Sequence, residues 1–234
     1  MGAEALLHAA VLNNARWCDA VCRSHGYPGE FTGRLWVSAD HALPFYPNVI
    51  TLAPDVTAAE ATNGQDPSRP YSVKDSFARL DLAHDGLTPL FDATWMAVPT
   101  PAGGDDPSWE AVTDPGELVR WEAAWAGGDE VIGLFQPALL DDADCAVLAC
   151  RRGSTQVGGA IAYTADGVTG ISNVFKSGIA SGPLWEGVVR AVAELRPGLP
   201  IVGYERGEDL AAARQAGFRT LGPLRVWLSG SAVA

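Results

Sequence analysis

The chain has 234 residues, 47% of them hydrophobic, and a formal net charge of −12 at pH 7. These values fit a globular protein with one large or two small domains, and no apolar run is long enough to span a membrane. The negative charge disfavours nucleic acids and anionic membranes as partners and favours small cationic ligands. Residues 1–10 lack the basic start of a secretory signal, so we expect a cytoplasmic protein.

The first predicted element is an amphipathic helix over residues 7–22, because apolar side chains recur there at spacings of three and four. Gly26 ends this helix. Asn13 and Asn14 lie on or near its apolar stripe. A buried amide there must find hydrogen-bond partners, so it can fix a turn or a ligand.

Strand-like segments and two loops follow the helix. The strands are predicted at residues 31–38, 49–52, 76–82 and 94–98. One loop is predicted over residues 57–70, and the other, 99–107, is the best linker candidate because it is rich in proline, glycine and aspartate. We therefore predict an N-terminal helix-and-strand subdomain over residues 1–98, a linker over 99–107 and a second domain over 108–234.

The second domain shows a regular succession of strands and helices. Asp114-Pro115-Gly116-Glu117 has the form of a capping box and opens a helix. Three strands joined by tight turns predict antiparallel hairpins, and Gly158-Gly159 in the middle one indicates a bulge or a close backbone approach. The predicted strands are residues 109–112, 145–151, 156–163, 168–175, 200–204 and 224–228, and the later helices are 185–195 and 208–215.

The four cysteines give no metal-binding or redox motif. Cys18 and Cys22 share one helix face, whereas Cys145 and Cys150 point to opposite faces of a strand. Neither pair has CxxC spacing, and the histidines form no pattern of metal ligands. We therefore expect the four thiols to pack in the core and expect no metal site.

The loop after residues 168–175 is the segment most suggestive of a ligand site. Its small residues Gly178, Ala180 and Ser181 open a helix. Backbone N–H groups and the positive end of the helix dipole then converge on one point, which suits a phosphate or a developing oxyanion. An ordinary strand-to-helix turn has the same sequence features, so both interpretations stay open.

The order of elements over residues 109–228 resembles the GNAT-type N-acetyltransferase family. Gly178-Ile179-Ala180-Ser181 is similar to its acyl-CoA loop, and Ala216-Gly217-Phe218 resembles the Gly-Phe ending of its last helix. The resemblance implies an α/β fold with a mixed sheet, here with an N-terminal helix-plus-strands extension, and acetyl-CoA as the acyl donor. It assigns these residues to the strand edge facing pantetheine and to the pyrophosphate loop: Asn173, Val174, Phe175, Lys176, Gly178, Ala180 and Ser181.

Two positions depart from the family pattern. Phe175 stands where the loop motif has Arg or Gln, and Ala213 stands where the family has its general-acid Tyr. Glu205 is our first candidate for a general base, with Tyr204 beside it, because a partly desolvated carboxylate there would have a raised pKa. A surface glutamate at a strand end is the alternative interpretation.

Three functional hypotheses follow. The first is an acyl-CoA-dependent N-acyltransferase for a small amine, and the second is a GNAT-like module without CoA binding that serves as a binding or sensing protein. The third places the chemistry on or near the N-terminal helix, at Asn13, Asn14, Cys18, Cys22 and His25. We predict that the active-site mouth of the first is lined by Trp36, Phe45, Tyr46 and Trp95. The helix at 185–195 and the last strand are also compatible with a homodimer.

Overall fold

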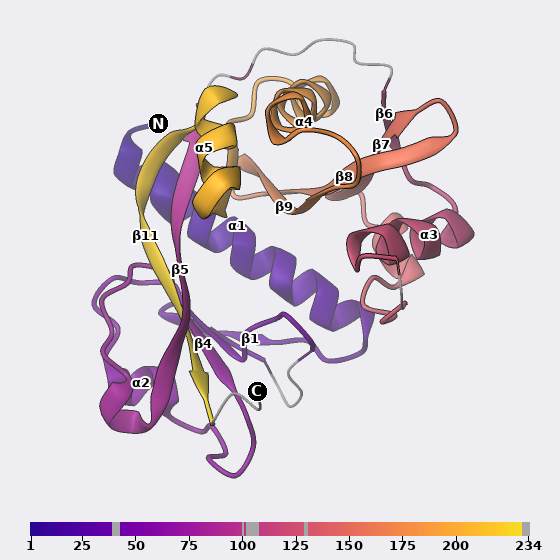
Figure 1. The fold of residues 1–234 in the computed structure, drawn as a ribbon. Helices are drawn as coiled ribbons and strands as arrows, with labels where there is room; N and C mark the ends of the chain where they lie inside the picture. The colour runs from indigo at the N-terminus through magenta and orange to yellow at the C-terminus, as the bar shows by residue number, and fades with distance from the viewer. Residues whose placement is uncertain (39–42, 100, 102–107, 129–130, 231–234) are drawn as a thin grey trace.

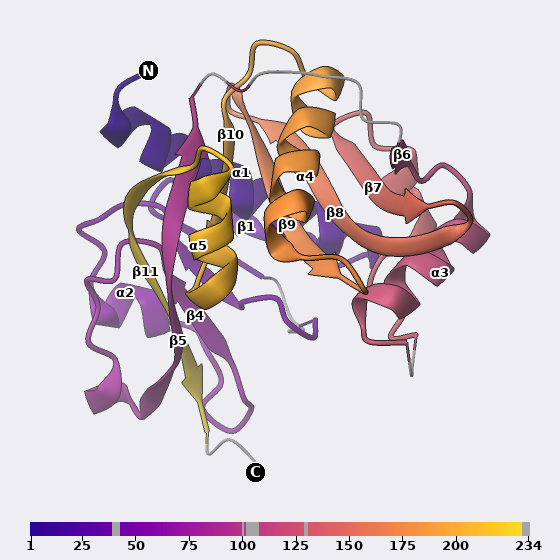
Figure 2. The same ribbon diagram turned by 45° about the horizontal axis from the view of Figure 1, so that its top comes forward.

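The computed structural model describes residues 1–38, 43–99, 101, 108–128 and 131–230. Within these residues the strands form one mixed eleven-stranded sheet (Figure 1), and helices cover both of its faces (Figure 2). The prediction of an α/β protein with a mixed sheet is confirmed. In the described part of the chain, no helix combines the length and apolarity needed to cross a membrane. Most of the predicted linker, residues 100 and 102–107, lies outside the described residues.

The N-terminal part supplies the longest helix and one edge of the sheet. The predicted apolar stripe is buried along helix α1 (Ala3–Ser24), which crosses one face of the sheet. The other elements of this part are β1 (Glu30–Phe31), β2 (Leu35–Val37), β3 (Val49–Thr51), α2 (Ala58–Thr62), β4 (Ser72–Asp75), the 3₁₀ helix η1 (Ala83–Asp85) and β5 (Leu87–Val98).

The C-terminal part follows the predicted order closely. Asp114 caps α3, since its carboxylate accepts the N–H of Glu117 at 3.0 Å. The elements are β6 (Trp109–Ala111), α3 (Pro115–Trp125), the 3₁₀ helix η2 (Pro137–Leu140), β7 (Cys145–Arg152), β8 (Thr155–Ala165), β9 (Val168–Lys176), α4 (Ser181–Leu195), β10 (Ile201–Glu205), α5 (Gly207–Gln215) and β11 (Arg219–Ser229).

Strand β5 joins the two parts. The strand order is β1-β2-β3-β4-β11-β5-β10-β9-β8-β7-β6, so β5 lies between β10 and β11 and is antiparallel to both. The last predicted strand, residues 224–228, lies within β11, which β5 separates from β10. Strands from both sides of residues 99–107 share one sheet, and the domain division drawn at those residues stays a prediction.

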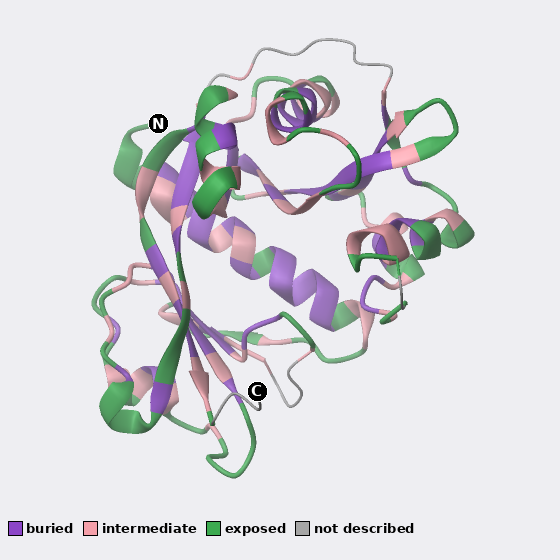
Figure 3. Cartoon of the chain, viewed as in Figure 1, coloured by how far each residue is buried: buried purple, intermediate pink, exposed green. Residues whose placement is uncertain are grey.

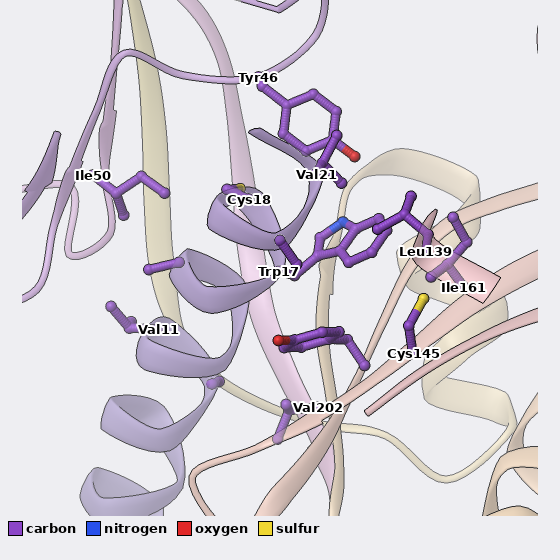
Figure 4. Packing of buried hydrophobic residues seen from close by; sticks show 14 of the residues in the cluster. Val11, Trp17, Cys18, Val21, Tyr46, Ile50, Leu139, Cys145, Ile161 and Val202 are labelled. Atoms are coloured by element: carbon purple, nitrogen blue, oxygen red, sulfur yellow. The ribbon is translucent and has the colours of Figure 1, made fainter. Parts of the chain in front are cut away.

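Separate cores fill the two faces of the sheet. Helices α1 and α3 pack on one face, and α4 and α5 pack on the other (Figure 3). Figure 4 shows the first core, where Trp17 and Cys18 of α1 lie among side chains from the sheet and from the loop that carries Tyr46. Cys145 belongs to this core and Cys150 to the other, as the prediction of opposite faces requires.

The glycine pair in β8 marks a close approach. A Cβ at Gly159 would collide with the indole of Trp121 and the ring of Phe175, so α3 and β9 can reach this strand only because it lacks a side chain there. The register between β8 and β9 also shifts after Gly159. The predicted bulge or close approach is confirmed.

Three predictions of secondary structure are wrong. Residues 31–38 are not one strand but contribute to two, β1 and β2, which pair with each other antiparallel. Residues 76–82 are not a strand, because the carboxylate of Asp75 accepts the N–H groups of Phe77 and Leu80 and closes a turn in which Ala78 has a φ of 50°. The predicted loop at residues 57–70 contains α2, which is opened by a capping box of Thr57 and Glu60. In the last two places, hydrogen bonds between polar side chains and nearby backbone N–H groups fix the local structure.

Candidate functional site

Strands β9 and β10 are parallel neighbours that pair only at one end. The paired residues are Thr169 with Ile201 and Gly170 with Val202. Farther along β9, Asn173 has a φ of 51°, a left-handed conformation that is uncommon for a residue other than glycine and is often found at functional sites. A cavity of about 190 Å³ lies at this level between the two strands.

The cavity brings together four of the predicted site residues. Asn173 and Val174 line it from β9, and Tyr204 and Glu205 line it from β10. The other lining residues that the argument uses come from α1, β4 and the loop before β3, and they are Asn14, Cys18, Phe45, Tyr46 and Lys74. Phe175, Lys176, Gly178, Ala180 and Ser181 do not line this cavity, since they continue β9 into the loop and the first turn of α4.

Glu205 is the residue in this cavity whose pKa suits a general base. Burial, with a smaller contribution from the Asp209 carboxylate, raises the pKa of Glu205 to about 7. The backbone N–H and the charge of Arg206 act in the opposite direction. A carboxyl group with this pKa exchanges its proton near neutral pH, which is the range that suits a general base.

Tyr204 is held by contacts on several sides. Its ring packs edge-on against Trp95, with 5.2 Å between the ring centroids. Its hydroxyl accepts a hydrogen bond from Nζ of Lys74 at 3.2 Å, and the same ammonium donates to Oδ1 of Asn14 at 2.8 Å. Because Lys74 donates to the tyrosine oxygen, the hydroxyl proton of Tyr204 is available to another acceptor.

The loop after β9 has features that suit a phosphate. Gly178 has a φ of 79°, and a Cβ there would meet nothing within 4 Å. Helix α4 begins after Ala180, and no capping side chain accepts a hydrogen bond from the N–H groups of its first turn. Nζ of Lys176 contacts the hydroxyl of Ser181 and lies 3.8 Å from the carboxylate of Asp209.

The two departures from the family pattern are both buried or packed away from this loop. The ring of Phe175 packs edge-on against Trp121, with 5.1 Å between centroids, in the core that contains α3. Ala213 is fully buried on α5. Lys176 is therefore the cation that the loop itself offers.

Of the residues of the third hypothesis, Asn14 and Cys18 line this cavity, whereas Asn13, Cys22 and His25 do not. Burial raises the pKa of Cys18, and it raises the pKa of Cys22 to about 12, so neither thiol is ionised near neutral pH. The Asn13 amide donates to the carbonyl of Tyr163 at 2.9 Å, and a His25 ring nitrogen lies 2.8 Å from the carbonyl of Leu134. Among the described residues, no group of histidine, cysteine and carboxylate side chains could hold a metal ion.

Two of the four aromatic residues predicted to line an active-site mouth lie at this cavity. Phe45 and Tyr46 line the cavity, whereas Trp36 and Trp95 are core residues whose indoles donate to Asp19 and to the carbonyl of Ser76. Sequence reasoning missed Lys74 because β4 was not predicted. The available signal was composition: Lys74 and Lys176 are the two lysines of the chain, and both lie at the candidate site.

The comparisons with known proteins identify the fold. No protein-family model and no curated protein matches the chain. Among solved structures, the chain has the fold of the GNAT acetyltransferases, and the likeness extends well beyond the predicted residues 109–228. A GCN5-related N-acetyltransferase from Kribbella flavida matches with a TM-score of 0.65 at 17% identity, covering 96% of this chain and 97% of that one. A GNAT-family protein from Novosphingobium aromaticivorans matches with a TM-score of 0.59 at 15% identity, covering 94% and 99%.

Proposed function

We propose that this protein is an acyl-CoA-dependent N-acyltransferase that acts on a small amine, with Glu205 as its general base. The observation that carries the proposal is the position and the pKa of Glu205. Its carboxyl group, with a pKa of about 7, lines a cavity at the splay of β9 and β10 in a GNAT fold. A base at this level can take the proton of an ammonium substrate near neutral pH.

The residues present fit an acyl-CoA. The open backbone at Gly178, the uncapped start of α4 and Lys176 suit the pyrophosphate, and the unpaired edge of β9 at Asn173 and Val174 suits the pantetheine amides. When bound, acetyl-CoA supplies a thioester carbonyl that an amine can attack. The carboxylate of Asp209 beside Lys176 opposes this fit in part, because it competes with a phosphate for the ammonium.

The residues of the chain divide the proton transfers between them. Glu205 in its ionised form accepts the proton that the attacking amine must lose, so the new C–N bond forms to a neutral nitrogen. Tyr204 holds a hydroxyl proton in the same cavity and can deliver it to a departing thiolate as the C–S bond breaks. Tyr204 thus takes the role that the family gives to a tyrosine at the position of Ala213.

A titration of the purified chain with CoA and acetyl-CoA tests the proposal. We expect saturable binding by calorimetry, and a ligand at a hundred times its dissociation constant should stabilise the fold by about 2.7 kcal/mol. Acetylation of a panel of small amines should then follow. No binding at millimolar CoA would contradict the proposal and favour the second candidate, a binding or sensing protein, which the uncharged Phe175 supports.

A further inference from the structure

Lys74 is a buried cation in the wall between two cavities. Lys74 is 4% exposed. It lines both the cavity beside Glu205 and a second cavity of about 470 Å³. Tyr204, Phe45 and Tyr46 also line both. The two cavities therefore share one wall, with the ammonium of Lys74 in it.

The charge of Lys74 has neutral partners. An ammonium has three N–H donors, and the acceptors in the structure are Oδ1 of Asn14 and the hydroxyl of Tyr204. Nζ also lies 4.6 Å from the centroid of the Tyr204 ring. Within the described ranges, no carboxylate forms an ion pair with this lysine. A buried charge without a counter-ion is costly, so binding of an anion beside Lys74 would be stabilising.

Lys74 keeps its proton despite burial. Burial lowers the pKa of Lys74, but the net direction is upward, and the hydrogen bond that Nζ donates to the Tyr204 hydroxyl contributes to it. The side chain is therefore an ammonium at neutral pH. The charged neighbours that act on Glu205 are Asp209 and Arg206, so Glu205 and Lys74 form two separate poles of the same cavity.

A second donor faces the same region. Tyr46 is 7% exposed and lines both cavities, and its buried hydroxyl has no hydrogen-bond partner in the described part of the chain. Such orphaned buried groups call for an explanation, and a ligand with an acceptor oxygen provides one.

The second cavity is apolar. Its walls include Leu90, Phe91, Val226 and Leu228, together with the prolines of the loop before β3. An anionic group at Lys74 would therefore be attached to an apolar body lying in this cavity.

We propose that the acceptor is an apolar amino acid, whose carboxylate is bound by Lys74 while its amine is presented to Glu205. This inference rests on the proposed function and names its substrate class. The net charge of the chain favours cationic ligands in general, but the local charge at the cavity selects a molecule that carries both an amine and a carboxylate.

The test is calorimetric binding of a matched product pair, N-acetyl-L-phenylalanine and its carboxamide, which differ only in the charged group. We expect the wild-type chain to bind the acid at least tenfold more tightly than the amide. Lys74→Met should remove this preference, whereas Lys74→Arg should keep most of it. Lys176→Met is the matched control, since it removes the other lysine and should leave the preference intact.

Several outcomes would overturn the inference: equal binding of acid and amide by the wild type, binding of neither, or an unchanged preference in Lys74→Met. The wild-type comparison decides the question even if Lys74→Met does not fold, which its melting curve would reveal. A parallel CoA titration separates the two proposals. CoA binding without a carboxylate preference overturns the substrate class alone. A carboxylate preference without CoA binding overturns the acyltransferase function, and with it the role of the bound molecule as an acyl acceptor, while the carboxylate site at Lys74 stands.

Discussion

The two halves of the candidate site are built in different ways. The loop side, from Asn173 to Ser181, is one continuous stretch of strand, loop and helix start, and much of it is exposed. The acceptor side combines residues that are far apart in sequence, such as Asn14, Lys74 and Tyr204, and holds them by buried contacts. A local segment can be recognised by its sequence, whereas a distributed pocket exists only once the sheet has formed.

This difference has a chemical side. The loop side offers backbone N–H groups and an exposed lysine, which serve any phosphate. The acceptor side offers desolvated charges at fixed positions, and in the function proposed above these would set specificity, because each must be matched by its ligand. Four predictions test this difference between the two sides.

The largest effect is expected on the acceptor side, from Glu205→Gln. Loss of a general base lowers kcat by roughly 10²–10⁴-fold. The wild-type rate should rise with pH through about 7, because only the ionised carboxylate accepts a proton, and the variant should lose this dependence. Steady-state kinetics from pH 5.5 to 9, with exposed Glu208→Gln on the same surface as the control, measure both. An unchanged pH profile in Glu205→Gln would remove Glu205 from the mechanism.

The next effect is on stability. The native state holds the Glu205 proton up to about pH 7, whereas the unfolded chain releases it near 4.5. The free energy of unfolding therefore falls as pH rises between these two values, by at most about 3 kcal/mol, and this contribution is constant above them. Glu205→Gln should accordingly gain stability relative to the wild type from pH 4.5 to pH 8 in denaturant titrations. A difference that does not vary with pH would show that the carboxyl is solvated.

A smaller effect is expected on the loop side, from Gly178→Ala. The left-handed φ of 79° costs a residue with a Cβ about 1–2 kcal/mol, so the loop should rearrange and CoA should bind roughly tenfold more weakly. Gly198→Ala is the matched control, because Gly198 has a φ of 80°, open space around it and a position beyond the other end of α4. Both variants should lose similar stability. Equal loss of CoA affinity in both would argue against a role for the loop.

The smallest effect concerns Asp209, the residue that acts on both sides. Asp209→Asn removes a carboxylate beside Lys176 and a charge that raises the pKa of Glu205. CoA should bind a few-fold more tightly, and the rise of rate with pH should move to lower pH by less than about one unit. Calorimetry and pH–rate profiles measure the two shifts. A change in only the CoA affinity or only the pH dependence of the rate would show that the charge of Asp209 does not act on both sides of the site.

The sequence predicted local features well. The helix start at Asp114, the hairpins of β7–β9 and the close approach at Gly159 all follow from short motifs. Glu205 and Asn173, named from the family resemblance, line one cavity, and their functional roles stay predictions. Lys74 could not be found in this way, and Asn14, although it was a candidate on the first helix, could not be placed beside Lys74. Their role depends on β4 pairing with β11 and on α1 crossing the sheet, and both are contacts between distant segments. In addition, the alternation of apolar and polar residues in the turn after Asp75 led us to predict a strand there, and β4, which lies just before the turn, was not predicted.

The position of β5 has a consequence for how the protein is made. Both neighbours of this strand, β10 and β11, are translated only after the whole central part of the chain has left the ribosome. Until then the long backbone edge of β5 has no partner from either side, and α1 has no complete surface to cover. We expect late, non-local folding with a strong need for chaperones. Released chains that end before residue 219 lack β11, and they should be far less protease-resistant than chains that end after residue 229.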